Sequence, residues 1–294
     1  MRGLIAALAL ILLNFNLQIA QSQGGPPMSY DFDDKLIGPV RIVHVESAQV
    51  LRTGNKYTEG SRTPLQETTY NTQGRKTVEV SYNDGGATFV RKVFSYGAKS
   101  QLKEVAEYKS DDSLIRRRVY THNEKNTEEL TYKGDGTLNP GKVVNTFDDS
   151  GRKTGVTTFS AEGMPFVKAI VTYRDDGKLT EVAVYASSVS GRMLVQSGKG
   201  KMVVLSDAIK DEMKRAPAHF DSLLTSRTVF TLDDAGHITE AATYAYDNSL
   251  VNRKKYAREF DARGNWIKEA VSSWNIKSSK FEPSYVTYRT ITYY

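Results

Sequence analysis

A short unit recurs along much of this 294-residue chain: an aromatic residue, a polar turn, a glycine and a new β-rich run. The aromatic residues that close these runs lie 12 to 15 residues apart. Strands average about 5 to 6 residues, so this spacing is typical of one strand followed by one turn. The aromatic residues of the repeat are Tyr70, Tyr82, Tyr96, Tyr108, Tyr120, Tyr132, Phe147, Phe159, Tyr173 and Tyr185. The repeat predicts a chain built mainly of short strands.

The glycines of the repeat indicate how the strands are connected. Each follows an aromatic residue by four to six positions, where a turn needs the positive φ that only glycine adopts freely. They are Gly74, Gly136, Gly151, Gly163, Gly177, Gly236 and Gly264. Acidic pairs such as Asp148-Asp149 and Asp233-Asp234 precede them, and their carboxylates can accept backbone N–H bonds within the turn. Connections this short predict antiparallel neighbours.

The alternation of side chains along the strands is uneven. From Lys76 to Tyr82, apolar and polar side chains alternate and so point to opposite faces of a sheet. Arg116, Arg118 and Tyr120 share one face, which is poor for an apolar core. We infer a sheet with one partly buried face and one solvated face, as is common in antiparallel sheets.

These observations predict an all-β fold: a repetitive antiparallel β-meander, twisted or curled toward a barrel. We expect a single β-repeat domain over residues 36–294, with repeats at about 65–185 and 229–274. An insertion at about 186–228 interrupts the repeat, and it contains the one helix that we predict, near 206–216. Ser206 is placed to cap this helix, and Pro217 marks its end.

The N-terminus has the pattern of a secretory signal peptide over residues 1–22. Arg2 supplies a positive start, Leu4 to Leu13 are apolar, and small residues precede a cleavage site near Ser22. An uncleaved anchor is the alternative, although the apolar run is shorter than the roughly 20 residues of a membrane-spanning helix. Residues 23–35 are then a flexible mature N-terminus. We expect a secreted, periplasmic or cell-envelope protein without a transmembrane segment after cleavage.

The segment from Phe260 through Asp261 and Gly264 to Trp266 resembles the tyrosine–aspartate (YD, or Rhs-type) repeat. Phe147–Gly151 and Tyr173–Gly177 are similar but degenerate, and Leu36–Arg41 resembles the entry segment of some secreted bacterial repeat proteins of unknown role. The resemblance extends over roughly Leu65 to Tyr185 and Val229 to Trp274. It implies a β-sheet scaffold, of a kind often curled or wound into a shell, at or beyond the bacterial cell envelope.

Composition excludes several kinds of chemistry. The chain has no cysteine, which rules out disulfides, thiolate metal sites, a cysteine nucleophile and a lipoprotein anchor. Its net charge of +6 permits contact with acidic polymers, but the basic residues are interleaved with acidic ones. The longest basic run is Arg116-Arg117-Arg118, so we predict no nucleic-acid partner.

No catalytic, cofactor-binding or metal-binding residue is assigned from the sequence. His44, His122, His219 and His237 are far apart along the chain and have no metal-ligand spacing. No G-x-S-x-G motif or phosphate-binding glycine loop is present. We expect no cofactor. Structural calcium at acidic turns such as Asp175-Asp176 stays an alternative to simple turn chemistry.

The 17 tyrosines allow two interpretations. Tyrosines on one sheet face can stack on sugar rings, with nearby Arg and Lys for acidic groups. Alternatively, they are cross-strand packing that stabilises the sheet. The sequence favours the second interpretation but leaves the first open.

The first functional hypothesis is a non-enzymatic secreted or envelope-associated scaffold or binding protein, with an envelope polysaccharide or a protein as partner. The second is a secreted hydrolase whose carboxylates come together only in the fold. The third is an outer-membrane β-barrel, whose strands need about 9 to 11 residues and an apolar outer face. Ligand, oligomeric state and ligand-binding residues are not predicted.

Overall fold

A computed structural model of the protein describes residues 36–54, 56–139, 141–187 and 222–294. The predicted signal peptide, the flexible mature N-terminus and the predicted helix near 206–216 lie outside these residues. In the described part of the chain, no helix has the length and hydrophobicity needed to cross a membrane.

All regular structure in the described ranges is β-strand. The sixteen strands are β1 (Val40–Thr53), β2 (Lys56–Tyr70), β3 (Lys76–Tyr82), β4 (Thr88–Tyr96), β5 (Leu102–Lys109), β6 (Leu114–His122), β7 (Asn126–Lys133), β8 (Lys142–Phe147), β9 (Lys153–Phe159), β10 (Pro165–Tyr173), β11 (Leu179–Ser187), β12 (Ser222–Leu232), β13 (Ile238–Ala245), β14 (Leu250–Phe260), β15 (Trp266–Asn275) and β16 (Lys280–Tyr293).

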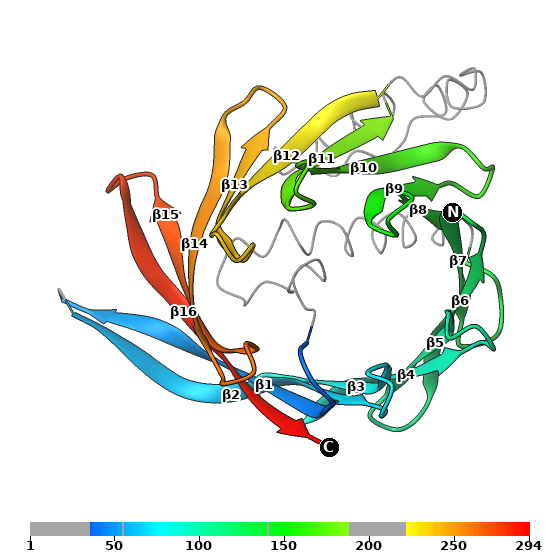
Figure 1. The fold of residues 1–294 in the computed structure, drawn as a ribbon, viewed down its shortest axis with the longest axis horizontal. Coiled ribbons are helices and arrows are strands. Elements are labelled where there is room, and N and C mark those ends of the chain that lie inside the picture. The colour runs from blue at the N-terminus through cyan, green and yellow to red at the C-terminus, as the bar shows by residue number, and fades with distance from the viewer. Residues whose placement is uncertain (1–35, 55, 140, 188–221) are drawn as a thin grey trace.

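The strands form one closed antiparallel barrel in sequence order (Figure 1). Each strand pairs with the next along the chain, and β1 closes the ring by pairing with β16, from Val40 opposite Tyr293 to Gln49 opposite Tyr285. The predicted all-β class and antiparallel meander are confirmed. The sequence predicted a sheet twisted or curled toward a barrel, and in the structure it closes completely.

The turns explain why the repeat forms this meander. In the turn before β15, the Asp261 N–H donates to the Asn265 carbonyl at 2.8 Å, and the Gly264 N–H donates to the Asp261 carbonyl at 3.1 Å. Gly264 has a φ of +90°, which a Cβ would resist. The carboxylate of Asp261 also accepts the backbone N–H groups of Arg263 and Asn265, both at 2.9 Å. The predicted roles of glycine and aspartate are confirmed here.

The same turn ties the beginning of the described chain to the last repeat. The Asn265 side chain, only 4% exposed, accepts from the Ile37 N–H at 2.7 Å and donates to the Ile37 carbonyl at 2.9 Å. It also donates to the Tyr293 hydroxyl at 2.8 Å. These bonds join the segment before β1 to β15 and β16 and so support closure of the barrel.

Two details of the predicted repeat are wrong. Tyr120 and Tyr185 do not close their strands, because β6 continues to His122 and β11 continues to Ser187. The insertion at 186–228 is also narrower than predicted, since β11 runs to Ser187 and β12 begins at Ser222. The residues at the end of β11 and the start of β12 pair as strands despite their polar composition.

Candidate functional site

The pairing register divides the barrel wall into two faces. Side chains on directly opposed residues share a face, so Glu79, Lys92, Glu107 and Arg116 follow one another along one face through β3, β4, β5 and β6. This face holds most of the buried side chains of the strands. We call it the lumen face, because side chains converge on the concave side of a closed barrel, and we call the opposite side the outer face.

The lumen face of β3 to β7 is charged, and we call it the charged arc. Its members are Glu79, Lys92, Glu107, Arg116, Arg118, Tyr120 and Glu129. Glu107 is 3% exposed and accepts from Arg116 Nε at 2.7 Å and Arg118 Nη2 at 2.9 Å. Lys92 Nζ lies 2.6 Å from Glu79, which is 7% exposed. The buried carboxylates of this arc are therefore held by cations.

Electrostatics within the charged arc follow from this pairing. Burial raises the pKa of Glu79, but the ammonium groups of Lys92 and Lys76 outweigh it and leave that pKa below its ordinary value. Burial also raises the pKa of the Tyr120 hydroxyl well above its usual range, and the neighbouring Glu129 carboxylate adds to the effect. Glu79 is thus ionised at neutral pH and Tyr120 is protonated, so neither is poised for proton transfer.

The lumen face of β10 to β13 is apolar, and we call it the apolar arc. It comprises Ala169, Val171, Leu179, Val182, Phe230, Ile238 and Ala241, each less than 10% exposed. Tyr173, Leu232 and Tyr256 pack against it. The register continues across the arc, with Val171 opposite Val182 and Phe230 opposite Ala241. This wall of the lumen is therefore mainly hydrocarbon, and the hydroxyls of Thr228 and Thr243, which lie on the same face, hydrogen-bond to each other at 2.9 Å.

The outer face carries charge around the ring. Arg117 pairs with Glu104 at 3.2 Å, and Lys268 pairs with Glu259 at 3.1 Å. Further cross-strand ion pairs on this face are Lys142–Glu128 at 2.6 Å, Arg227–Glu181 at 3.4 Å and Arg253–Glu240 at 2.6 Å. Arg and Lys side chains also cover aromatic rings, as Arg227 covers Tyr244 at 5.0 Å. These charged groups make the outer face compatible with contact to water.

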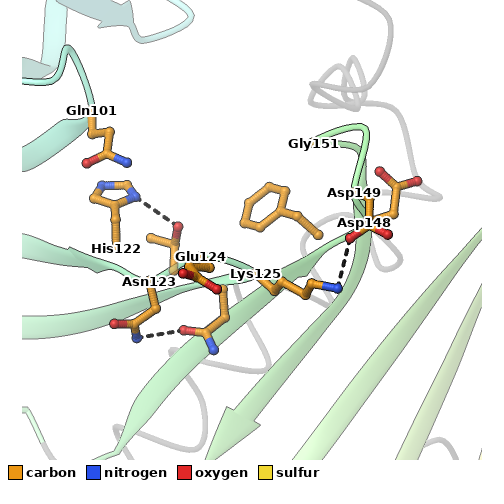
Figure 2. Close-up of a pocket in the computed structure, with 11 residues that line it drawn as sticks. Gln101, His122, Asn123, Glu124, Lys125, Asp148, Asp149 and Gly151 are labelled. Carbon is orange, nitrogen blue, oxygen red and sulfur yellow. Dashed lines mark hydrogen bonds and ion pairs between the residues drawn. The ribbon is translucent and has the colours of Figure 1, made fainter.

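One open depression of about 360 Å³ lies on the rim, between the turns before β5, β7 and β9 (Figure 2). Its lining residues are Gln101, His122, Asn123, Glu124, Lys125, Asn126, Thr127, Phe147, Asp148, Asp149 and Gly151. The turn between β6 and β7 is shorter than its neighbours, with the Asn123 N–H bonded to the Asn126 carbonyl at 2.9 Å. This short turn hollows the rim locally.

Histidine 122 in this depression is structurally engaged rather than free. Its Nε2 lies 2.6 Å from the Leu102 carbonyl, and its Nδ1 lies 3.0 Å from the Thr127 hydroxyl (Figure 2 shows the second contact). A carbonyl oxygen only accepts, so Nε2 carries a proton and donates to Leu102, while Nδ1 contacts the Thr127 hydroxyl. Tyr96 and Tyr173 make the corresponding bond to a carbonyl 20 residues earlier. His122 therefore occupies the tyrosine position of the repeat.

The other histidines are not brought together. His44 lies 3.7 Å from Glu67, and His237 lies 3.2 Å from Asp233 in its own turn. His219 is outside the described residues. No group of three or more histidine or acidic side chains that could hold a metal occurs in the described ranges.

Hydrogen bonds within the turns account for the aspartates of the repeat without requiring a bound ion. Asp148 accepts the N–H groups of Ser150 and Arg152 at 2.9 Å, and its Oδ2 pairs with Arg152 Nε at 2.7 Å. The backbone N–H of Arg152 lowers the pKa of Asp148, with the guanidinium of Arg152 adding to it. Calcium at such turns stays a prediction.

Most tyrosines of the repeat pack rather than stand free. The Tyr96 ring is covered by Arg75 at 5.4 Å, and the Tyr173 ring by Arg152 at 5.1 Å. Exposed tyrosines are Tyr57, Tyr246 and Tyr294, which lie on separate parts of the two rims. This distribution favours cross-strand packing over a continuous platform for sugar rings.

Sequence reasoning missed the charged arc and the apolar arc, because both depend on the pairing register across the sheet.

No protein-family model and no curated protein matches the chain. A porin-like protein from Bacteroides uniformis has a similar fold, with a TM-score of 0.51 and 11% identity over 87% of this chain and 98% of that one. A porin-like protein from Bacteroides vulgatus (TM-score 0.24, 10% identity, 87% and 99% covered) and a DUF1329 family protein from Desulfovibrio piger (0.25, 11%, 86% and 86%) match more weakly. The Bacteroides uniformis match supports the all-β barrel class.

Proposed function

We propose that this protein is a non-enzymatic, envelope-associated binding protein whose barrel stands in water and accepts an apolar ligand in its lumen. The observation that carries the proposal is the apolar arc, a hydrocarbon surface on the lumen face of β10 to β13. Barrels of about 16 strands are wide enough to leave a channel, so side chains alone do not fill them. The secretory pattern of residues 1–22 supports an envelope or secreted location.

The outer face supports a water-facing barrel. In a membrane barrel, each Arg or Lys on the lipid face costs about 2–4 kcal/mol at the bilayer midplane, falling toward zero near the headgroups. Here Arg117, Arg227 and Arg253 stand on the outer face beside carboxylates of neighbouring strands. Several strands are also short for a bilayer, since β8 has 6 residues and β9 has 7, against the roughly 9 to 11 that a bilayer requires.

A membrane-spanning pore is the second candidate. It is favoured by the closed sixteen-strand meander and by the fold similarity to the porin-like protein from Bacteroides uniformis. The ion pairs on the outer face of the described strands argue against it, because a barrel wall that meets lipid needs a continuous apolar band.

The hydrolase alternative needs paired carboxylates with one raised pKa. The buried acids of the lumen wall do not meet this requirement. Glu107 lies between two guanidinium groups, and the pKa of Glu79 is lowered by Lys92 despite burial. We therefore propose binding rather than catalysis.

The test is binding of the neutral fluorescent probe N-phenyl-1-naphthylamine to protein purified without detergent. We expect saturable binding that Val171→Gln weakens at least tenfold, because Val171 is 5% exposed within the apolar arc. The matched control is Ile170→Gln, one residue away on the outer face and 36% exposed, which should leave binding unchanged. No saturable binding, or equal loss in both variants, would contradict lumen binding. Aggregation unless detergent is present would favour the membrane pore.

A further inference from the structure

Two polar side chains meet at the edge of the apolar arc on the lumen face. Lys254 of β14 stands directly opposite Ala241, a member of that arc. Tyr285 of β16 stands opposite Val271, which in turn is opposite Tyr256. The Lys254 Nζ lies 5.8 Å from the centre of the Tyr285 ring. The register thus brings an ammonium group and a phenol together beside a hydrocarbon wall.

The Tyr285 hydroxyl is a buried donor without a partner. Tyr285 is 3% exposed, and its oxygen has no hydrogen-bond partner in the described part of the protein. A buried hydroxyl without a hydrogen-bond partner destabilises the fold, so its retention calls for an explanation. Burial raises the pKa of Tyr285 far above its usual range, which keeps the phenol protonated and able to donate.

Lys254 is a partly buried cation of β14. No carboxylate of the described residues forms an ion pair with it, although Glu269 raises its pKa from a distance. Burial lowers that pKa more strongly, because the ammonium is partly removed from water. The Glu269 carboxylate is already committed to Arg258, at 2.8 Å, with both side chains about one-tenth exposed.

The surrounding lumen face is positive. Among the described residues of β14 to β16, the register places Lys254, Arg258 and Arg289 on this face, with the carboxylate of Glu269 beside Arg258 and that of Glu282 opposite Ser273 toward the strand ends. Arg289 lies 3.4 Å from the centre of the Trp266 ring, so its charge is held in place by an aromatic surface. The donors and the net positive charge together select an anion.

We propose that Lys254 and Tyr285 form a receptor for the anionic head of a long-chain amphiphile whose hydrocarbon chain lies on the apolar arc. This site rests on the proposed lumen binding and specifies its ligand class. The head is a carboxylate or a phosphate, because both accept from an ammonium and a phenol. The apolar surface begins at Ala241, directly opposite Lys254, so a chain can extend from the bound head onto the arc.

The test compares three probes in displacement of N-phenyl-1-naphthylamine: hexadecanoate, hexadecan-1-ol and a lysophosphatidylglycerol. Lys254→Met removes the cation and keeps the length of the side chain. We expect it to raise the Kd for hexadecanoate at least tenfold and to leave the Kd for hexadecan-1-ol unchanged. Tyr285→Phe should raise the hexadecanoate Kd a few-fold. The matched control is Lys255→Met, the next residue along, exposed on the outer face, which should change neither.

The outcomes separate this site from the proposed function. If wild-type protein binds neither the neutral probe nor the alcohol, lumen binding itself is wrong. If Lys254→Met leaves hexadecanoate binding unchanged, or weakens acid and alcohol equally, the anion receptor is overturned while lumen binding stands. Tighter binding of lysophosphatidylglycerol than of hexadecanoate would identify a lipid headgroup, and the reverse a free acid. Thermal melting checks that both variants fold, and Tyr285→Phe should not lower the melting temperature.

Discussion

The apolar arc and the charged arc are two regions of one lumen wall, built on the same backbone. Both have antiparallel strands joined by the same glycine turn, with φ of +74° at Gly74 beside the charged arc and +79° at Gly163 beside the apolar arc. They differ in the side chains of the lumen face, which are apolar at Val171 and Phe230 in one arc and charged at Glu107 and Arg118 in the other. The repeat therefore specifies the barrel, while the alternate positions are free to specify what each part of the lumen contacts.

The largest expected effect tests the charged arc. Glu107→Leu leaves the guanidinium groups of Arg116 and Arg118 without their buried carboxylate. Breaking a buried pair by removing one partner costs about 3–5 kcal/mol. We expect a loss of that size in urea unfolding followed by circular dichroism.

The control for that variant is Glu104→Gln on the outer face of the same strand. Glu104 pairs with Arg117, and the two side chains are 28% and 41% exposed. An exposed pair contributes about 0–1 kcal/mol. Equal losses in the two variants would contradict the assignment of the two faces.

The apolar arc should respond to loss of volume rather than of charge. Phe230 is 6% exposed, and Phe230→Ala removes its ring from the arc. Truncation of a buried Phe costs about 3–5 kcal/mol, and an open lumen places the result at the low end of that range. The Phe230→Ala change should also weaken binding of the neutral probe, whereas Glu107→Leu should leave that binding unchanged. Unfolding and probe titration on the same samples measure both.

Changes in the shared turn should affect the two regions alike. At Gly74 and Gly163 an added Cβ meets nothing within 4 Å, so only the positive φ opposes a side chain. Gly74→Ala and Gly163→Ala should each cost about 1–2 kcal/mol. Asn in place of Ala should cost less, because Asn248 already occupies the corresponding position with a φ of +62°. Clearly different costs at the two sites would show that the turns are not equivalent.

The smallest effect is a pH dependence confined to the charged arc. The folded pKa of Glu79 lies below its ordinary value of 4.5, so its contribution is present above that pH and is lost as pH falls below it. Glu79→Gln should reduce the loss of unfolding free energy between pH 5 and pH 3. The apolar arc variant Phe230→Ala should keep the wild-type slope. A Glu79→Gln profile parallel to that of the wild type would contradict a contribution of Glu79 to the pH dependence of stability.

The sequence predicted what local chemistry determines. Aromatic residues such as Tyr70, Tyr82 and Phe159 end their strands, and glycines such as Gly264 adopt the expected positive φ. Tyr120 was misassigned because the spacing was regular there, although the turn after His122 is shorter.

The candidate sites could not be predicted in the same way. Lys254 and Tyr285 are 31 positions apart in the sequence and meet only through the register of β14, β15 and β16. The charged arc similarly depends on which residues oppose each other across five strands. A one-residue slip in register would exchange the two faces, and the sequence of a single strand does not determine the register. Barrel closure likewise depends on the pairing of β1 with β16.

In the proposed function, the outer face stands in water and the lumen face holds the ligand. Because the chain has no cysteine, Ile170→Cys and Val171→Cys each give a single reactive thiol, on opposite faces of β10. The measurement is the rate of reaction with a membrane-impermeant maleimide, alone, with phospholipid vesicles and with hexadecan-1-ol. We expect fast labelling at position 170 under all three conditions, and slow labelling at position 171 that hexadecan-1-ol slows further. Protection of position 170 by vesicles, with position 171 open to the reagent, would contradict it.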